Sequence, residues 1–272
     1  MNDTPDWLVV TRQDAPLIVS VPHVGTDLAA FERRFVSPWI ARKDADWHID
    51  ELYDFVGALG ATIVRTKLSR SVIDVNRDPS GASLYPGQAT TELCPATTFD
   101  GEPLYRSREA PANLEIEQRR RTYFDPYHQA LRDEIARLRE RHSRIVLFDA
   151  HSIRSRIPRL FEGELPTFNL GTNSGKSCAA ELREAVRGVL AASGESNVVD
   201  GRFKGGWITR SFGRPEDGVH ALQMELACRA YMREPEFVDE ANWPTPFDAR
   251  SAEPTRATLR RVLETSLECV GG

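Results

Sequence analysis

Residues 17–25 read Leu-Ile-Val-Ser-Val-Pro-His-Val-Gly, an apolar run that leads directly into His23. Residues 145–152 repeat this arrangement, because Ile-Val-Leu-Phe leads into Asp-Ala-His-Ser and so into His151. Short apolar runs bounded by turn residues are typical of buried strands. Both histidines are therefore expected at the carboxyl ends of strands, and ligands bind at that edge of an open parallel sheet.

Apolar runs and helical periodicity alternate along the rest of the chain. Apolar runs predict strands at 16–22, 61–66, 72–75, 144–148, 197–199 and 221–225. Apolar residues three and four positions apart predict helices at 46–59, 114–142, 178–192 and 254–269. Two stretches rich in turn-forming residues, 77–111 and 162–176, are expected to be long loops. The pattern predicts an α/β fold, with a mostly parallel or mixed central sheet flanked by helices.

The composition limits the classes of partner. The chain has 272 residues, of which 40% are hydrophobic, and a net charge of −5 with both signs interspersed. One core can be buried at this length, so we expect a single domain over residues 1–272. The sequence has neither a basic stripe for nucleic acid nor an apolar run long enough for a membrane helix. Scattered cysteines and the lack of an N-terminal leader predict a cytoplasmic protein, and nothing indicates its oligomeric state.

The two strand-end histidines are candidate metal ligands. Zinc favours neutral imidazole nitrogens completed by a carboxylate, and residues 43–50 offer three aspartates and a further histidine. Asp46 is preferred as the third ligand, although acidic residues at this point also cap a helix. Asp149 lies on the same strand face as His151 and either orients that imidazole or caps the strand end. A lone histidine is usually structural, and it is the pair that favours a divalent metal, most simply zinc.

Arg70 and the pair Asn76-Arg77 bracket the apolar segment 72–75. The planar fork of arginine binds a carboxylate at two points, and an asparagine amide can add a further hydrogen bond. The alternative is a set of ordinary ion pairs that contribute little. Two arginines around one segment predict an anion-recognition element.

Glu225 lies within the apolar run 221–227, where a charge is costly unless it is paired or used. It is either a general base with a raised pKa or half of a buried ion pair. The glycine-rich segment 201–210 carries Lys204 and Arg210, which are candidate contacts for an acidic substrate. Such glycine-rich segments are also often plain turns.

Two other motifs in the sequence suggest different classes of enzyme. Residues 171–177, Gly-Thr-Asn-Ser-Gly-Lys-Ser, resemble a nucleotide-binding P-loop but are one residue short between the glycines. Ser152 follows His151, as in a serine hydrolase, but the chain lacks a G-x-S-x-G elbow and neighbouring strand residues face opposite ways. Neither pattern explains the polar residues at the strand ends.

Seven segments together closely resemble the N-formylglutamate amidohydrolase family, over about residues 7–243. They are SVPHVG (20–25), DADWHIDELYDF (44–55), SRSVIDVNRDPSGASLYPGQ (69–88), FDAHSIRS (148–155), RLFEGELPTFNLGTNSGKSC (159–178), GRFKGGWITR (201–210) and QMELACRAYM (223–232). The resemblance implies hydrolysis of N-formyl-L-glutamate to formate and L-glutamate in histidine degradation. It also implies a distant similarity to zinc carboxypeptidases and aspartoacylases.

That similarity implies a role for each candidate residue. The metal ligands would be His23, Asp46 and His151; Asn76 and Arg77 would bind substrate, Arg70 would stabilise the oxyanion, and Glu225 would be the catalytic base. These relatives place a glutamate three residues after the first histidine, where this chain has Thr26. Asp44, His48 and Asp27 therefore remain alternatives to Asp46. Ser211 and Phe212 stand where the family is expected to have histidine and tyrosine, so another N-acyl amino acid remains an alternative substrate.

Overall fold

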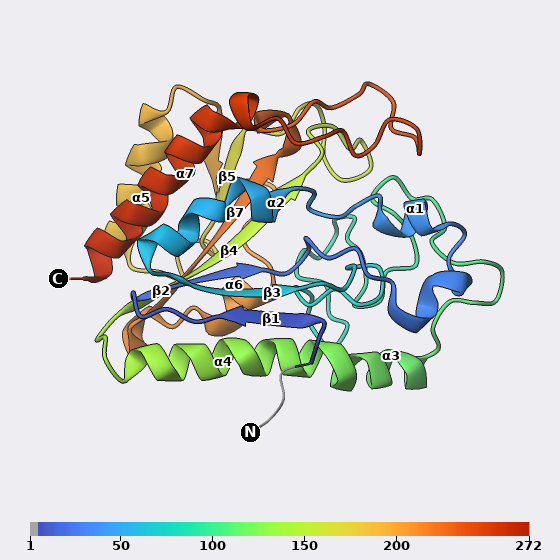
Figure 1. Cartoon of the computed structure of the whole chain (residues 1–272), viewed down its shortest axis with the longest axis horizontal. Coiled ribbons are helices and arrows are strands. Elements are labelled where there is room, and N and C mark those ends of the chain that lie inside the picture. The colour runs from blue at the N-terminus through green and yellow to red at the C-terminus, as the bar shows by residue number, and fades with distance from the viewer. Residues whose placement is uncertain (1–4, 272) are drawn as a thin grey trace.

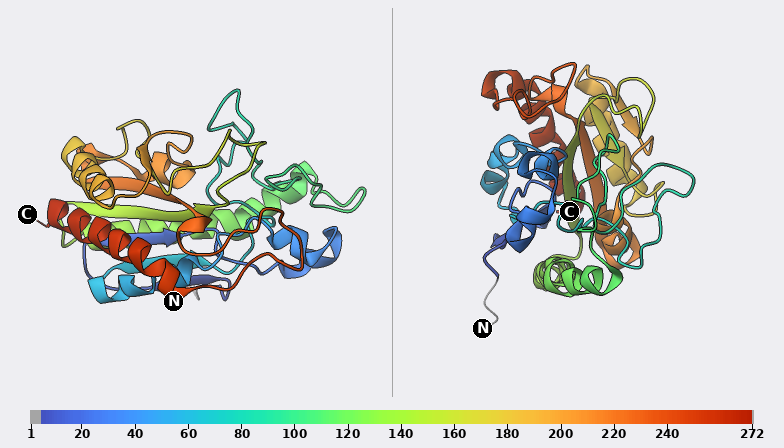
Figure 2. Two further views of the ribbon diagram at one scale, coloured as in Figure 1. Left: turned by 90° about the horizontal axis from the view of Figure 1, so that it is seen from above. Right: turned by 90° about the vertical axis from the view of Figure 1, so that its right-hand side faces the viewer.

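The computed structural model describes residues 5–271 and builds them around one seven-stranded sheet between layers of helices (Figures 1 and 2). The strands are β1 (Leu8–Thr11), β2 (Leu17–Val21), β3 (Thr62–Thr66), β4 (Ile145–Ile153), β5 (Phe168–Gly171), β6 (Asn197–Val199) and β7 (Val219–Ala227). Their order across the sheet is β1-β3-β2-β4-β7-β5-β6. The α/β fold with a mixed central sheet is thereby confirmed.

The middle of the sheet is parallel. Strands β3, β2, β4 and β7 run in one direction, whereas β1 and β5 are antiparallel to their neighbours β3 and β7. The register pairs Ser20 with Asp149 and His151 with Glu225. The carboxyl ends of β2, β4 and β7 therefore meet at one edge, which brings distant parts of the sequence together.

The helices cover both faces of the sheet. They are α1 (Pro38–Arg42), α2 (Ile49–Leu52), α3 (Asn113–Arg119), α4 (Asp125–Arg139), α5 (Ala180–Ala192), α6 (Trp207–Phe212) and α7 (Ala249–Val270), with a π-helical turn (Arg120–Phe124) between α3 and α4. In Figure 1, α5 and α7 lie together at the upper left and α4 lies along the bottom.

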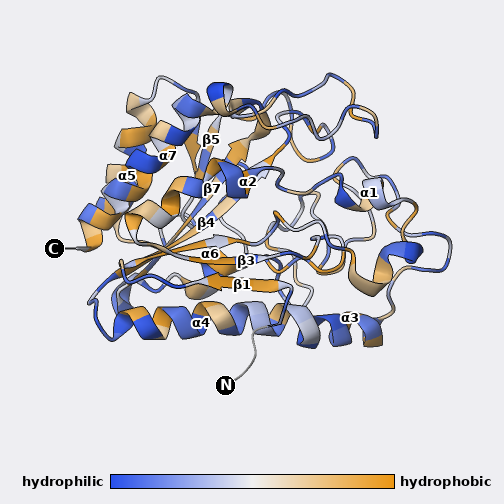
Figure 3. Ribbon diagram, in the orientation of Figure 1, coloured by the Kyte–Doolittle hydropathy of each residue, from blue (hydrophilic) through white to orange (hydrophobic). Residues whose placement is uncertain are grey.

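Alternation along the central strands explains the two layers. Leu17 and Val19 of β2 belong to the core shared with α2, α5 and α7, whereas Ile18 between them belongs to the core shared with α4 and α6. Successive strand side chains point to opposite faces, so a strand that is apolar throughout is buried on both. In Figure 3 the central strands are largely hydrophobic, while α4, α5 and α7 alternate between hydrophobic and hydrophilic residues. No helix within residues 5–271 is long and apolar enough to cross a membrane.

The structure corrects several predicted elements. Residues 72–75 are not a strand: the Asp74 N–H donates to the Leu93 carbonyl, and Arg119 donates to the Val72 carbonyl, so the backbone has no strand partner. The helix predicted at 46–59 is broken, because His48 has a positive φ of 60°. It becomes α2 and a separate 3₁₀ helix at 54–59. Strands β1 and β5 and the short helices α1 and α6 were not predicted.

Gly25, just after His23, is needed because two backbone segments cross there. A Cβ at this position would lie 2.3 Å from the carbonyl oxygen of Leu68. We expect Gly25→Ala to lower the free energy of unfolding by about 1–3 kcal/mol, the usual effect of overpacking. The matched control is Gly188→Ala on α5, where an added Cβ meets nothing within 4 Å. That variant should gain about 0.4–1 kcal/mol, and equal melting temperatures for the two would contradict the steric explanation.

Candidate active site

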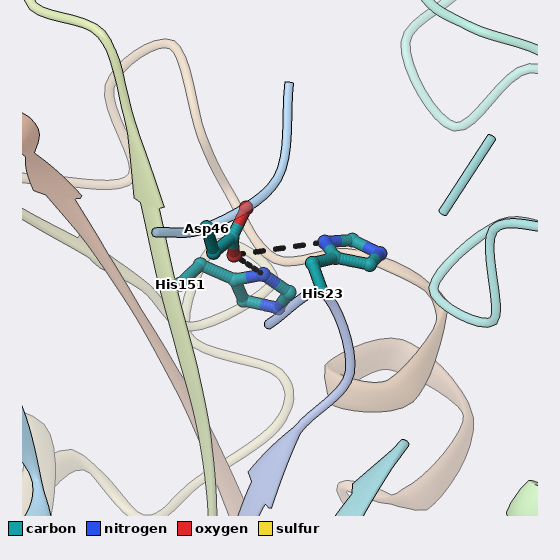
Figure 4. A group of neighbouring side chains, drawn as sticks. All are labelled: His23, Asp46 and His151. Carbon is teal, nitrogen blue, oxygen red and sulfur yellow. Dashed lines mark hydrogen bonds and ion pairs between the residues drawn. The ribbon is translucent and has the colours of Figure 1, made fainter. Parts of the chain in front are cut away.

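Three polar side chains from different parts of the chain meet at the carboxyl edge of the sheet (Figure 4). His23 follows β2 by two residues, and His151 lies within β4. Asp46 precedes α2, and its N–H donates to the carbonyl of His23 at 3.0 Å, which fixes the two segments together. All three are buried, with Asp46 fully excluded from solvent. The predicted set of His23, Asp46 and His151 is thus brought together.

The geometry of this cluster fits a metal ion. One Asp46 oxygen, Oδ2, lies 3.0 Å from His151 Nδ1 and 3.7 Å from His23 Nδ1. The three candidate ligand atoms all lie within 4.8 Å of one another, close enough for a single ion to contact them all. His23 Nδ1 and Asp46 Oδ1 are buried without a hydrogen-bond partner among residues 5–271. Buried polar atoms need a partner, and a cation in this position would supply one.

The far side of each imidazole is held by a carboxylate. His23 Nε2 lies 2.7 Å from Asp74 Oδ1, and His151 Nε2 lies 2.9 Å from Asp149 Oδ2. A proton on Nε2 of each ring leaves both Nδ1 atoms free to face the cluster, the usual arrangement of metal-binding histidines. Asp149 therefore has the position expected of an orienting residue. Asp74 was missed, although an acid within the apolar Val-Ile-Asp-Val segment is the same signal that identified Glu225.

The alternative third ligands lie elsewhere. Each has its own partner: Asp44 with Arg154 at 3.5 Å, His48 with Glu51 at 2.7 Å, and Asp27 with the Ala29 N–H at 2.8 Å. The backbone of residues 43–48 turns so that only Asp46 points toward the two histidines. This geometry favours Asp46 over the substitutes.

Arg70 adds a buried positive charge beside the cluster. Its Nη2 lies 2.7 Å from Asp74 Oδ2, and its Nη1 lies 3.5 Å from Asp46 Oδ1. Burial by itself lowers the pKa of Arg70, but the nearby carboxylates, Asp74 foremost, raise it above the ordinary value. Its guanidinium also lies 4.7 Å from the Phe99 ring centre. The group therefore stays charged and rigidly placed.

A cavity with an empty volume of about 570 Å³, counting its open mouth, connects these groups. Its walls include His23, Arg70, Asn76, Arg77, Tyr85, Thr91, Phe99, His151, Arg202, Phe203, Gln223 and Glu225. The loop 77–111 and the glycine-rich segment 201–210 both contribute to the walls, so these irregular stretches help to form the site.

Glu225 lies in this cavity because β7 pairs with β4, opposite His151. Burial raises its pKa to about 7, and the neighbouring cationic groups only partly oppose this effect. Its Oε2 accepts a hydrogen bond of 3.1 Å from the side chain of Gln223. No ion pair to Glu225 is formed within residues 5–271, so the geometry favours a proton acceptor over a structural pair.

The predicted substrate contacts differ in position. Arg77 lines the cavity, and its guanidinium donates to the carbonyl and hydroxyl oxygens of Thr91. Asn76 also lines it, but its amide bonds Asp149 at 2.9 Å and accepts from the Ile208 N–H, which makes it a support for the site. Lys204 and Arg210 do not line the cavity, and their predicted contact with substrate stays a prediction.

The structure also explains the two decoy motifs. Asp200 accepts hydrogen bonds from the N–H groups of Thr172 and Ser174 in the P-loop-like segment, so these two donors are already taken by a carboxylate. Ser152 accepts a hydrogen bond of 2.8 Å from Tyr231 and points away from the cavity-facing side of β4. Neither segment presents the chemistry that its motif suggests.

Comparison with known proteins identifies the family of this chain. The family model described as N-formylglutamate amidohydrolase matches residues 15–232. Two proteins described as N-formylglutamate deformylase are each 46% identical to this chain. The Pseudomonas putida protein matches over 93% of this chain and 92% of its own length, and the Pseudomonas aeruginosa protein over 94% of both.

Two solved structures share the fold. The N-formylglutamate amidohydrolase from Ralstonia eutropha superposes with a TM-score of 0.78 at 23% identity, covering 97% of this chain and 98% of that one. A gene product of Agrobacterium tumefaciens gives a TM-score of 0.69 at 13% identity, with 100% and 99% covered. The cavity combines a buried acid, a histidine cluster and cationic side chains, a combination that is typical of hydrolases. The chain belongs to the N-formylglutamate amidohydrolase family, as its motifs suggested.

Proposed function

We propose that this enzyme hydrolyses N-formyl-L-glutamate to formate and L-glutamate, the reaction named in its two Pseudomonas relatives. The observation that carries the proposal is 46% identity along more than nine-tenths of the chain. The family model also matches residues 15–232, a range that includes every residue lining the cavity. The local chemistry agrees with it: a basic pocket suits an acidic substrate, and a buried carboxylate suits proton transfer.

A metal ion is part of the proposal. His23, Asp46 and His151 would hold it, and two imidazoles with one carboxylate are the donor set that zinc favours. Bound there, zinc would lower the pKa of water toward neutrality and polarise the formyl carbonyl.

The side chains of this protein supply the remaining steps. Glu225 takes a proton from the attacking water, whose oxygen forms a bond to the formyl carbon. Arg70 donates hydrogen bonds to the carbonyl oxygen as negative charge develops on it. Glu225 then delivers the proton to the amide nitrogen, the C–N bond breaks, and glutamate leaves as the amine.

A different N-acyl amino acid is the alternative substrate. This alternative arises because Ser211 and Phe212 stand where the family is expected to have histidine and tyrosine. In the structure, however, Ser211 donates a hydrogen bond to the Ile208 carbonyl and Phe212 stacks on His128, and both residues lie outside the cavity. The departure therefore leaves the cavity walls unchanged, which favours N-formylglutamate. We also propose a cytoplasmic location, supported by four free cysteines of which three are buried.

Formate release from a panel of N-formyl, N-acetyl and N-succinyl amino acids, combined with elemental analysis of the purified protein, tests the function. We expect one divalent metal per chain and the highest kcat/KM for N-formyl-L-glutamate. Full activity in metal-free protein would contradict the proposed metal dependence. A clear preference for another acyl group would contradict the proposed substrate.

Arg77→Lys tests substrate anchoring. Lysine keeps the charge but loses the planar fork, so we expect KM to rise about tenfold with a smaller change in kcat. Because Arg77 also bonds Thr91, the melting temperature of the variant must be measured in parallel. An unchanged KM in a folded variant would remove Arg77 from substrate binding.

A further inference from the structure

Arg202 lines the same cavity as the catalytic groups but was not among the predicted contacts. Its neighbours Lys204 and Arg210 were the predicted contacts, because all three cations lie in one glycine-rich segment. In the structure it is Arg202 whose side chain reaches the cavity wall. The chemistry around its guanidinium indicates what it binds.

The three arginines of the cavity differ in their acidic partners. Arg70 contacts Asp74 and Asp46, and Arg77 lies 3.5 Å from Asp74. Arg202 forms no ion pair with any carboxylate in residues 5–271. Burial lowers its pKa, whereas the pKa of Arg70 is raised by its carboxylates. A partly buried cation without a counter-charge is costly, so an anionic ligand would be bound strongly there.

The guanidinium of Arg202 is nonetheless held in place. Its Nε donates to the Leu160 carbonyl at 2.8 Å, and its Nη2 donates to the Ala89 carbonyl at 2.9 Å. Its Cζ lies 5.2 Å from the ring centre of Tyr85 and 5.3 Å from that of Phe203, within the range of cation–π contacts. These neutral contacts orient the group without neutralising it, which is how a preorganised anion site is built.

We propose that Arg202 binds the side-chain carboxylate of the substrate and thereby restricts the enzyme to N-formyl amino acids with an acidic side chain. The proposal rests on the proposed deformylase function. An N-formyl amino acid has its α-carboxylate next to the scissile amide and its side-chain carboxylate further away. Arg77 contacts Asp74, which bonds His23, so it suits the nearer carboxylate. Arg202 makes no such contact with the cluster and suits the further one.

Arg202→Gln, assayed on two substrates of equal shape, tests this assignment. N-formyl-L-glutamate carries the side-chain charge, and N-formyl-L-glutamine lacks it. Hydrogen bonds to charged groups suggest that kcat/KM for the glutamate compound falls about 10- to 100-fold, mainly through KM. The value for the glutamine compound should change less than about threefold, so the preference of the wild type collapses.

Arg214→Gln is the matched control. Arg214 is also held by backbone carbonyls, those of Arg210 and Gly213, but it is exposed and outside the cavity. Arg214→Gln should leave the kcat/KM values for both substrates unchanged. That result would show that the loss in Arg202→Gln is not caused by the change in net charge alone. If Arg202→Gln does not fold, Arg202→Lys replaces it, with a selective rise in KM for the glutamate compound expected.

The outcomes separate the two proposals. Equal losses on both substrates, or no loss on either, would overturn the role of Arg202 while leaving the deformylase function in place. A folded, metal-loaded wild type that releases formate from neither compound would overturn the proposed function, and the assignment of Arg202 with it.

Discussion

His151→Ala is expected to lose its bound metal and its activity together, with turnover reduced to roughly the background rate of a site without its metal. In the proposed site the imidazole would supply one of three ligand atoms, and an alanine would leave Asp46 and His23 with too few donors for stable binding. His23→Ala and Asp46→Ala should behave in the same way. Elemental analysis and formate release on the same preparations measure both quantities.

The control for this variant is His142→Ala. His142 bonds the Asp14 carbonyl near the end of α4 and takes no part in the cavity. It should keep full metal content and normal turnover. Stoichiometric metal in His151→Ala would remove that residue from the ligand set, and normal metal content in Asp46→Ala would indicate Asp44 or His48 as the third ligand instead.

Glu225→Gln is the second large effect, because it preserves shape while removing the proton acceptor. We expect kcat to fall by about two to four orders of magnitude, with metal content and KM nearly unchanged. Stability should also be nearly unchanged, since glutamine can accept the same hydrogen bond from Gln223 and no cation loses an ion-pair partner. Metal loss would make Glu225 a ligand, and near-normal kcat with metal retained would exclude it as the base.

Glu134→Gln supplies the contrasting case. Glu134 is buried, as Glu225 is, but lies on α4 between Arg12 at 2.6 Å and Arg137 at 2.7 Å, away from the cavity. Removing that charge should lower the melting temperature and leave kcat normal, since the arginines lose their partner. Opposite responses of stability and turnover in these two variants would distinguish a catalytic carboxylate from a structural one.

The parts of the molecule that the sequence predicted best are those with strong local patterns. β2 and β4 begin with uninterrupted or nearly uninterrupted apolar runs, so the positions of His23 and His151 followed from them. β5 was missed because its four residues lie in a stretch rich in glycine, proline and asparagine, where pairing with β7 overrides local propensity. The segment 72–75 was misread as a strand because apolar side chains buried beneath a loop have the same pattern.

The side chains around the cavity were harder to predict, because their roles depend on the path of the chain. The sequence alone could not show whether Asp46 or Asp44 faces the two histidines. What distinguishes them in the structure is a hydrogen bond from the Asp46 N–H to the His23 carbonyl and the left-handed backbone conformation of His48. Arg202 could not be separated from Lys204 for a similar reason. Which cation of a glycine-rich loop turns inward is decided by contacts with Leu160 and Ala89, far away in the sequence.

The order of strands in the sheet has a consequence for how the chain folds as it is synthesised. β2, β4 and β7 lie side by side, but they begin at residues 17, 145 and 219. Closing loops of that length is slow, and β7 is synthesised about 200 residues after β2. A nascent chain that ends before β7 already carries both histidines but lacks Glu225 and the strand that pairs beside His151. Such fragments should have no hydrolytic activity. When the intact chain is refolded, its structure and its catalytic activity should recover in the same kinetic phase.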